Sequence, residues 1–338
     1  MRQKKKAGRG VRAMALALSA GMALCTLAGC TGGGTAKADT LSAAQYPEKI
    51  GFEDYDAQHA ARIARGELDK GFLEDIAEFC AQSACTVLRD RGEGNGLFSP
   101  VSLAVALSMA AGTADGETRG QVLSALGVDS MDTLEKEMHK LFQALYYDNE
   151  IGTLRLANSF WLSPEMAFRQ DTLDSLAQNF YASSFTLGED AQERIGSWIS
   201  EQTGGKLGQD YRLSDQRTVF LLLSTIYFSD EWIDRFSEDR TAKDNFYLRN
   251  GTTVRCDYLN TTRGSHGFRV GEGFIASSLS FKNGASMVFV LPDEGGAPED
   301  FLTDPARLRD ALTGGTESGY GEVVFQIPKF DYGVSMDL

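Results

Sequence analysis

The chain has 338 residues and carries 47 acidic against 33 basic side chains, a formal net charge of −14. Hydrophobic residues make up 42% and charged residues 24%, which are the proportions of a globular protein and exclude a largely disordered chain. The acidic excess excludes nucleic acid and anionic membrane surfaces as electrostatic partners, because both repel a negatively charged protein.

The first 29 residues predict a lipoprotein signal peptide. Residues 1–12 contain six basic residues and no acidic one, and an apolar run follows. A transmembrane anchor is the alternative, but the run is short for a membrane span. It ends in Leu27-Ala28-Gly29-Cys30, which resembles the lipobox of bacterial lipoproteins. That resemblance implies cleavage before Cys30 and a diacylglycerol on its sulfur. Loss of the six basic residues leaves 27 basic against 47 acidic side chains, a net charge of −20.

The segment after the signal peptide predicts a spacer. Small residues dominate 31–45, which is typical of a flexible tether, and 46–65 is polar without a clear period. We therefore predict a lipidated cysteine and flexible tether over 30–65, and one folded domain over 66–338.

The first half of that domain predicts mainly helices. Residues 68–89 have helical spacing, and a second helix begins with Ser99 as N-cap and Pro100 in the first turn. This second helix is apolar on all sides, which favours burial. Further helices are expected over the following ranges: 116–128 closing at Gly127, 132–147, 169–181 and 193–207.

Strands prevail later in the chain, so the predicted class is α+β with large mixed or antiparallel sheets. Residues 153–163 alternate as a strand, and the apolar run 217–232 is expected to be buried on both faces of a sheet. Asn250-Gly251 predicts a hairpin. The remaining expectations are strands over 244–260, 267–281, 285–296 and 323–327, a helix over 298–314 and a helix start at Ser335-Met336-Asp337-Leu338.

Catalysis, metal binding and cofactor binding find little support in the sequence. Cys80 and Cys85 would point about 140° apart around one helix, so we predict free thiols and no disulfide. His139 lies in a charged helical segment and is interpreted as a solvated residue; the other histidines are His59 and His266. Gly271-Glu272-Gly273 precedes a strand pattern, so it predicts a turn rather than a dinucleotide loop.

Six segments, in the same order along the chain, resemble the serpin family. They are NGLFSPVSLAVALSMAAGTADGETRGQVLSALG (95–127), LRLANSFWLS (154–163), WISEQTGGKL (198–207), TVFLLLSTIYFSDEW (218–232), LSFKNGASMVFVLPDEG (279–295) and FQIPKF (325–330). Each segment alone gives only a modest resemblance to the family, but six such segments in the family's order, from about residue 68 to 338, make the resemblance highly specific.

The resemblance implies a fold of three sheets and many helices, and an inhibitor of serine or cysteine proteases rather than an enzyme. A target protease cleaves an exposed reactive loop, which then inserts as a new strand into the large sheet and carries the acylated protease with it. By resemblance, the "shutter" beneath that sheet comprises Ser99, Pro100, Ser102, Asn158 and Ser224, and the "breach" contains Trp232. Ser224 departs from the family, in which asparagine is usual, so the shutter is expected to be weaker or rewired.

The family's hinge, reactive loop and closing strands have no counterpart in these 338 residues. We therefore expect an incomplete, C-terminally truncated sequence that lacks the reactive bond and is inactive as it stands. The complete protein is expected to be an exported monomeric inhibitor, anchored to membrane lipid through Cys30 on the extracellular or periplasmic side. The alternatives are a non-inhibitory envelope lipoprotein that binds a partner, and an envelope hydrolase assembled from distant residues.

Overall fold

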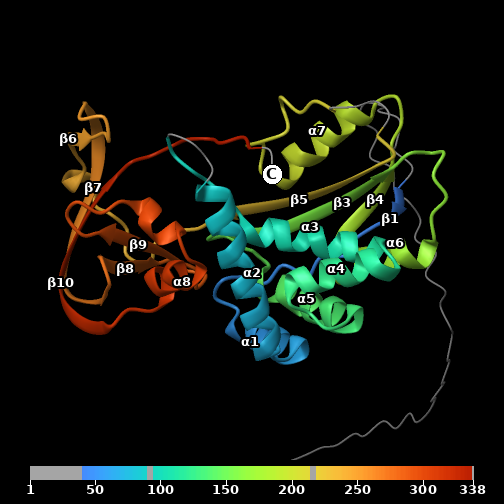
Figure 1. Cartoon of the computed structure of the whole chain (residues 1–338), viewed down its shortest axis with the longest axis horizontal. Helices are drawn as coiled ribbons and strands as arrows, with labels where there is room; N and C mark the ends of the chain where they lie inside the picture. The colour runs from blue at the N-terminus through green and yellow to red at the C-terminus, as the bar shows by residue number, and fades with distance from the viewer. Residues whose placement is uncertain (1–39, 90–93, 214–217, 337–338) are drawn as a thin grey trace, which may run out of the picture. The chain divides into compact units, whose positions relative to one another are not determined.

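Helices dominate the first part of the described chain and strands the second, which confirms the α+β class (Figure 1). The computed structural model describes residues 40–89, 94–213 and 218–336, all within one unit, Ala38–Leu338. Its helices are α1 (Tyr55–Arg65), α2 (Lys70–Arg89), α3 (Pro100–Thr113), α4 (Gly116–Leu126), α5 (Met131–Leu145), α6 (Gln170–Asn179), α7 (Ala191–Gln202) and α8 (Pro305–Thr313). Two 3-10 turns, η1 (Glu238–Arg240) and η2 (Pro298–Leu302), accompany them.

The first sheet has the order β1-β4-β3-β2, with β5 on the other side of β3. Its strands are β1 (Thr40–Ser42), β2 (Tyr147–Asp148), β3 (Thr153–Leu162), β4 (Ala182–Thr186) and β5 (Phe220–Ser229). β3 and β4 run parallel, whereas β3 and β5 are antiparallel over ten residue pairs, from Thr153↔Ser229 to Leu162↔Phe220.

The two faces of this sheet belong to different cores, because side chains alternate along a strand. On β5, Leu222 and Ile226 pack into the main core together with α2–α6, whereas Leu221 and Leu223 pack with Trp161 and residues of α7. Figure 1 accordingly shows α3, α4 and α6 on one side of the strands and α7 on the other.

The second sheet has the order β10-β7-β8-β9, with β6 paired to β7. Its strands are β6 (Ala242–Tyr247), β7 (Thr253–Gly271), β8 (Phe274–Ser280), β9 (Ser286–Pro292) and β10 (Glu317–Pro328). The resemblance implies three sheets, but the described residues form two. The 19-residue strand β7 pairs with β6 near its start and with β8 near its end, and so joins all five strands.

Several local predictions are confirmed. The Ser99 hydroxyl accepts a hydrogen bond from the Ser102 amide at the start of α3, with Pro100 in the first turn. Gly127 ends α4 in the left-handed conformation at φ 75°, which glycine adopts without a Cβ clash. The glycine pattern at 271–273 is the turn between β7 and β8, and Cys80, Cys85 and Cys256 are free thiols.

The predicted tether over 30–65 is too long, because the chain is folded from Thr40 onward. β1 pairs with β4, and Leu41 within β1 and Tyr46 after it pack against the main core. Residues 55–65 form the helix α1, with Asp54 as N-cap. The composition of this segment is dominated by small residues, so the sequence did not reveal that a few apolar side chains pack it against the core.

Strand β5 is not buried on both faces; its middle residues are half-buried and both of its ends are exposed. The reason is that, among the described residues, β5 pairs only with β3 and therefore has a free edge.

Other predicted boundaries also shift. The expected helix over 298–314 breaks at Thr303 into η2 and α8, since Asp304 and Pro305 start a new helix, and the closing strand extends back to Glu317. The chain through Met336 forms no helix, and Asp337 and Leu338 lie outside the described residues.

Candidate functional site

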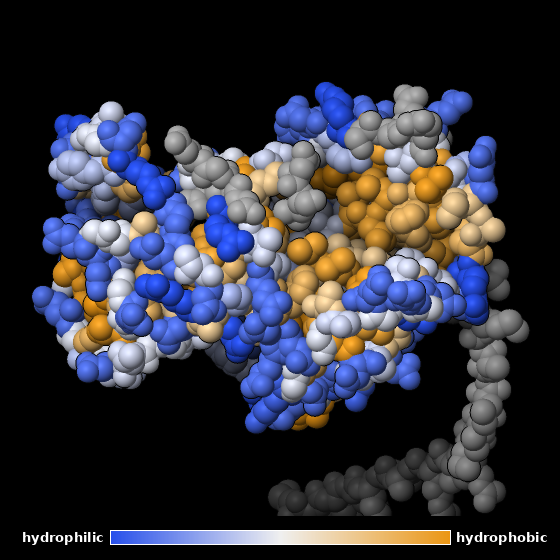
Figure 2. Space-filling view, viewed as in Figure 1, coloured by the Kyte–Doolittle hydropathy of each residue, from blue (hydrophilic) through white to orange (hydrophobic). Residues whose placement is uncertain are grey.

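The free edge of β5 is the candidate functional site. It lies between α7 and α3, and the space-filling view shows hydrophobic side chains gathered along it (Figure 2). Exposed fractions of 48% for Phe220 and 42% for Phe228 are large for aromatic side chains. In the part of the chain that the structure describes, no strand hydrogen-bonds to this edge. An edge with unpaired backbone groups and apolar flanks can accept one more strand.

Ser99, Pro100 and Ser102 lie together at the start of α3, the helix that packs on β5. The Ser102 hydroxyl donates to the Ser99 hydroxyl at 3.0 Å, and the Ser102 backbone N–H donates to the same oxygen at 3.3 Å. This is an ordinary helix N-cap with a second hydroxyl added.

Asn158 and Ser224 face each other across β3 and β5 in the antiparallel register. Directly opposed residues point to the same side of a sheet, and the neighbouring Leu222 and Ile226 pack there into the main core. The Asn158 side chain is 1% exposed, and its Nδ2 donates to the Phe180 carbonyl at 2.6 Å. Its Oδ1 finds no hydrogen-bond partner among the described residues.

The structure therefore groups the five predicted shutter residues into two sets. Ser99, Pro100 and Ser102 form one and Asn158 with Ser224 the other, and no hydrogen bond between described residues joins the sets. Among the described residues, no hydrogen bond joins Ser224 to Asn158 Oδ1, and the expected change in the shutter stays a prediction.

Trp232 lies just beyond the end of β5, where the two sheets meet. It pairs with Phe281 through an isolated bridge, and the two rings stack with centroids 4.1 Å apart. Phe228 and Phe236 contact this pair edge-on, at 5.0 Å from Phe281 and 6.0 Å from Trp232. The tryptophan thus anchors the end of β5 to the turn between β8 and β9.

Polar groups surround this aromatic cluster, and their position could not be predicted from the sequence. Asp230 accepts hydrogen bonds from the Tyr147 hydroxyl at 2.9 Å and from the Asn283 side chain at 3.1 Å. Burial and the Asp230 acceptor together raise the pKa of Tyr147. The only signal in the sequence was that Asp230 and Asn283 each lie in a segment that resembles the serpin family. This signal does not reveal that the two side chains are in contact.

Glu231 forms two ion pairs beside Trp232. Its Oε2 lies 2.6 Å from Arg235 and 2.7 Å from Lys282. The hydrogen bond from Arg235, followed by that from Lys282, lowers the pKa of Glu231 to about 2. The bond to Lys282 also ties the end of β5 to the second sheet.

The described histidines do not assemble a catalytic site. The prediction that His139 is a solvated residue is wrong, because its side chain is half-buried. The His139 ring stacks on Tyr181 with centroids 5.6 Å apart, and its Nδ1 lies 2.9 Å from the Gln178 carbonyl oxygen. His266 meets the Ser278 carbonyl through Nε2. In the described ranges, no histidine is hydrogen-bonded to a serine or cysteine side chain, and no three metal-ligating residues cluster.

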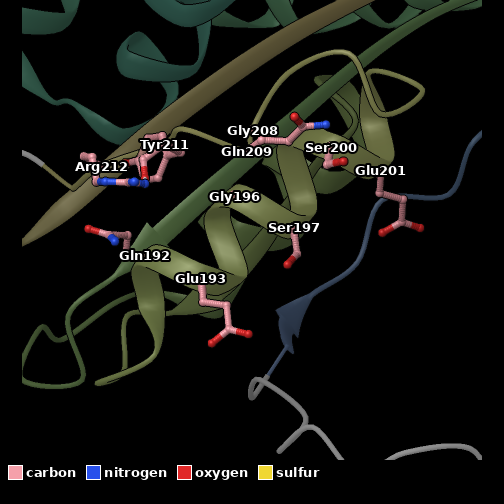
Figure 3. Close-up of a pocket in the computed structure, with 10 residues that line it drawn as sticks. All are labelled: Gln192, Glu193, Gly196, Ser197, Ser200, Glu201, Gly208, Gln209, Tyr211 and Arg212. Atoms are coloured by element: carbon pink, nitrogen blue, oxygen red, sulfur yellow. The ribbon is translucent and has the colours of Figure 1, made fainter.

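A polar hollow of about 650 Å³ lies on α7 and the loop that follows it (Figure 3). The lining includes Ser197, Ser200 and Glu193, and Figure 3 shows these side chains on different turns of the helix, with no histidine or cysteine among the lining residues. Among the described residues, no hydrogen bond joins Ser197 or Ser200 to a carboxylate or another base of the hollow, so neither serine is held as an activated nucleophile.

Cys30, the predicted lipid anchor, lies outside the described residues. Among the helices that the structure describes, none has the length and apolar character needed to cross a membrane.

Comparison with known proteins identifies relatives of this fold. The family model described as "Serpin (serine protease inhibitor)" matches residues 74–338. The chain is 27% identical over 295 residues to an alpha-1-antitrypsin-like protein of Tamias sibiricus, covering 83% of this chain and 67% of that protein. It is 27% identical to alpha-1-antiproteinase of Mus saxicola, covering 65% of this chain and 56% of that protein. The chain thus spans between about half and two thirds of these relatives.

Solved structures agree on the fold. Native tengpin, a thermophilic serpin, superposes with a TM-score of 0.70 at 24% identity, covering 79% of this chain and 69% of tengpin. Cleaved human thyroxine-binding globulin superposes with a TM-score of 0.64 at 20% identity, covering 76% of this chain and 78% of that structure. The family match spans most of the chain, and we conclude that the protein belongs to the serpin family.

Proposed function

We propose that the chain is part of an exported, lipid-anchored inhibitor that traps serine or cysteine proteases. The observation that carries the proposal is the free edge of β5, a ten-residue strand that pairs only with β3 among the described residues. In the family mechanism, a cleaved loop joins the large sheet as an added strand, so the sheet needs an edge that can receive one.

The side chains along β5 fit this role. Phe220 and Phe228 are partly exposed, whereas Leu222 and Leu223 are half-buried on opposite faces. An added strand would pair the free backbone groups of β5 and cover this apolar surface. Burial contributes about 25 cal/mol per Å² of apolar surface, so covering these side chains would favour insertion.

The reactive loop is proposed to lie in sequence that follows Leu338. We expect the coding sequence downstream to specify a small-residue hinge, a loop and further strands. The test is incubation of the protein expressed from the complete reading frame with a panel of serine and cysteine proteases. The expected product is a 1:1 protein–protease complex that withstands denaturing gel electrophoresis. A reading frame without a hinge and loop, or ordinary cleavage without a complex, contradicts the proposal.

Cys30 is proposed to hold the protein on the outer face of the cell membrane through its diacylglycerol. Two signals support this: the basic and apolar leader, and the small residues directly before the cysteine. Mass spectrometry of the N-terminal peptide should find Cys30 at the start of the mature chain with a thioether-linked lipid. Replacement of Cys30 by serine should release the protein from the membrane fraction.

A non-inhibitory serpin that binds a partner is the second candidate. The orphaned Asn158 Oδ1 opposite Ser224 favours it, because a rewired shutter alters the strand separation that inhibition requires. Thyroxine-binding globulin, a structural neighbour, was solved with bound thyroxine and is an example of a serpin with a ligand. If this reading holds, the complete protein forms no complex with any protease and its melting temperature does not change after loop cleavage.

A further inference from the structure

The folded domain begins close to the proposed lipid anchor. β1 adds to the edge of β4, with Thr40 opposite Phe185. The start of α6 holds the segment from the side: Gln170 Nε2 donates to the Leu41 carbonyl at 3.1 Å, and the Ser42 hydroxyl donates to Asp174 at 2.9 Å. Figure 1 shows β1 beside the start of α6.

Only nine residues, 31–39, separate Cys30 from Thr40. Ten Cα steps span at most about 35 Å, whatever conformation the residues adopt. A domain of this size is about 50 Å across. The connection is therefore too short for the far end of the domain to reach the membrane easily, and the end that carries Thr40 stays near it.

That end of the first sheet exposes apolar side chains. The loop between β3 and α6 presents Met166 and Phe168, with exposed fractions of 38% and 45%. Its first residue, Ser163, donates its amide to the Val219 carbonyl at 2.9 Å and accepts the Met166 amide at 2.9 Å. Val219 is itself 52% exposed. These three apolar residues therefore belong to the end of the first sheet at which β1 begins, since Thr40 and Trp161 both lie opposite Phe185.

We propose that Met166, Phe168 and Val219 form a membrane-contact patch that rests on the phospholipid surface when Cys30 is lipidated; this inference rests on the proposed lipid anchor. Tethering keeps the patch at a high effective concentration near the bilayer, so a small apolar contact suffices. Three acidic residues, Glu165, Asp171 and Asp174, flank the patch in the sequence against one basic residue, Arg169, which pairs with Asp171, so the net charge beside the patch has the sign of anionic lipids. The contact is therefore made with neutral, zwitterionic headgroups and weakens on an anionic bilayer.

The patch fixes which end of the sheet faces outward. β5 begins at Phe220, beside the patch, and ends at Ser229, next to Trp232. Ten strand residues cover about 33 Å. Trp232 and the end of the sheet near it therefore point away from the membrane, where a soluble protease can approach.

Tryptophan substitutions in the lipidated protein test this orientation. Phe168→Trp places an emitter in the patch, and Tyr320→Trp replaces an aromatic residue that is 83% exposed on the second sheet. Both proteins are purified with lipid from the membranes of the expressing bacterium and reconstituted in phosphatidylcholine vesicles that carry bromine on the upper acyl carbons. The emission of the wild-type protein, with its three native tryptophans, is subtracted.

We expect brominated lipid to remove most of the emission added by Phe168→Trp and none of that added by Tyr320→Trp. Met166→Trp gives a second measurement in the patch, and the melting temperature of each variant verifies its fold. Equal quenching in the two positions, or no quenching of Phe168→Trp and Met166→Trp in protein whose Cys30 lipid is verified by mass, overturns the orientation alone. A Cys30 without lipid overturns the anchor and the orientation together.

Discussion

Glu137 on α5 is the only charged side chain that is buried among the described residues, with 2% of its surface exposed. Its Oε2 accepts the Asp69 backbone N–H at 2.9 Å, and its Oε1 accepts the Lys140 ammonium at 2.8 Å. The carboxylate therefore satisfies the start of α2 and holds α5 against it. Burial opposes ionisation, yet the hydrogen bonds from Lys140 and Asp69 keep the pKa of Glu137 below its ordinary value.

Replacement of Glu137 by alanine should lower the free energy of unfolding by about 3 kcal/mol, because it leaves the Lys140 charge and the Asp69 N–H without their buried partner. Replacement by glutamine should cost less, since one amide oxygen still accepts a hydrogen bond. Urea unfolding of the two variants at neutral pH measures both values. An alanine variant as stable as the wild type would show that the carboxylate carries no structural role.

The same carboxylate gives stability a pH dependence. Because the folded pKa lies below the unfolded value near 4.5, the stabilisation is complete above pH 4.5 and is lost as pH falls through the folded pKa. Between pH 6 and pH 3, the melting temperature of Glu137→Gln should therefore fall less than that of the wild type. Parallel curves for the two proteins would contradict this assignment.

The opposed pair Asn158 and Ser224 leads to a second prediction about a single residue, the effect of an amide at position 224 on stability. An amide at position 224 could donate to the buried Asn158 Oδ1, which has no partner in the part of the chain that the structure describes. Ser224→Asn should therefore raise the free energy of unfolding by about 1 kcal/mol, the net value of one hydrogen bond. In Asn158→Ala the same substitution should bring no gain, and this double-mutant comparison isolates the pair. A gain of equal size in both backgrounds means that the new amide bonds elsewhere.

The segment before α1 is an element that composition did not reveal. The Tyr46 ring stacks on Tyr146 with centroids 6.0 Å apart and contacts Tyr181 in a tilted arrangement at 5.6 Å. Lys49 pairs with Asp148 of β2 at 2.8 Å, and the Phe52 amide donates to Glu150 at 3.1 Å. The segment therefore ties β4 to the β2–β3 connection along the side of the first sheet away from β5.

Tyr46→Ala should destabilise the fold by about 2 kcal/mol, since it removes a half-buried aromatic ring from the core. Tyr55→Ala is the matched control: Tyr55 is 68% exposed on α1, so its removal should change stability by less than about 0.5 kcal/mol. Thermal unfolding distinguishes the two. If both variants are neutral, residues 40–52 do not contribute to the folded domain.

At the scale of the whole molecule, the sequence predicted what local chemistry determines. Ser99 and Pro100 mark a helix start, Gly127 marks a helix end, and alternation marks β3; all three are confirmed. These features depend on residues within one turn or one strand.

Long-range pairings were beyond local patterns. The opposition of Asn158 and Ser224 joins residues 66 positions apart, and the single partner of β5 depends on which other strands fold beside it. Hydropathy could predict that β5 is a strand. It does not distinguish an edge strand from a central strand of the same apolar composition. The proposed shutter and breach roles come from family resemblance and stay predictions.

The central claim is that β5 receives an added strand when a protease attacks. Hydrogen exchange of the complete protein, before and after reaction with a protease that it traps, tests this most directly. The amides of Phe220–Ser229 that do not bond to β3 should gain protection, and the melting temperature should rise with them, because a new strand would pair with the edge that carries no strand among the described residues. Unchanged exchange along β5 after the loop has been cleaved would contradict the account.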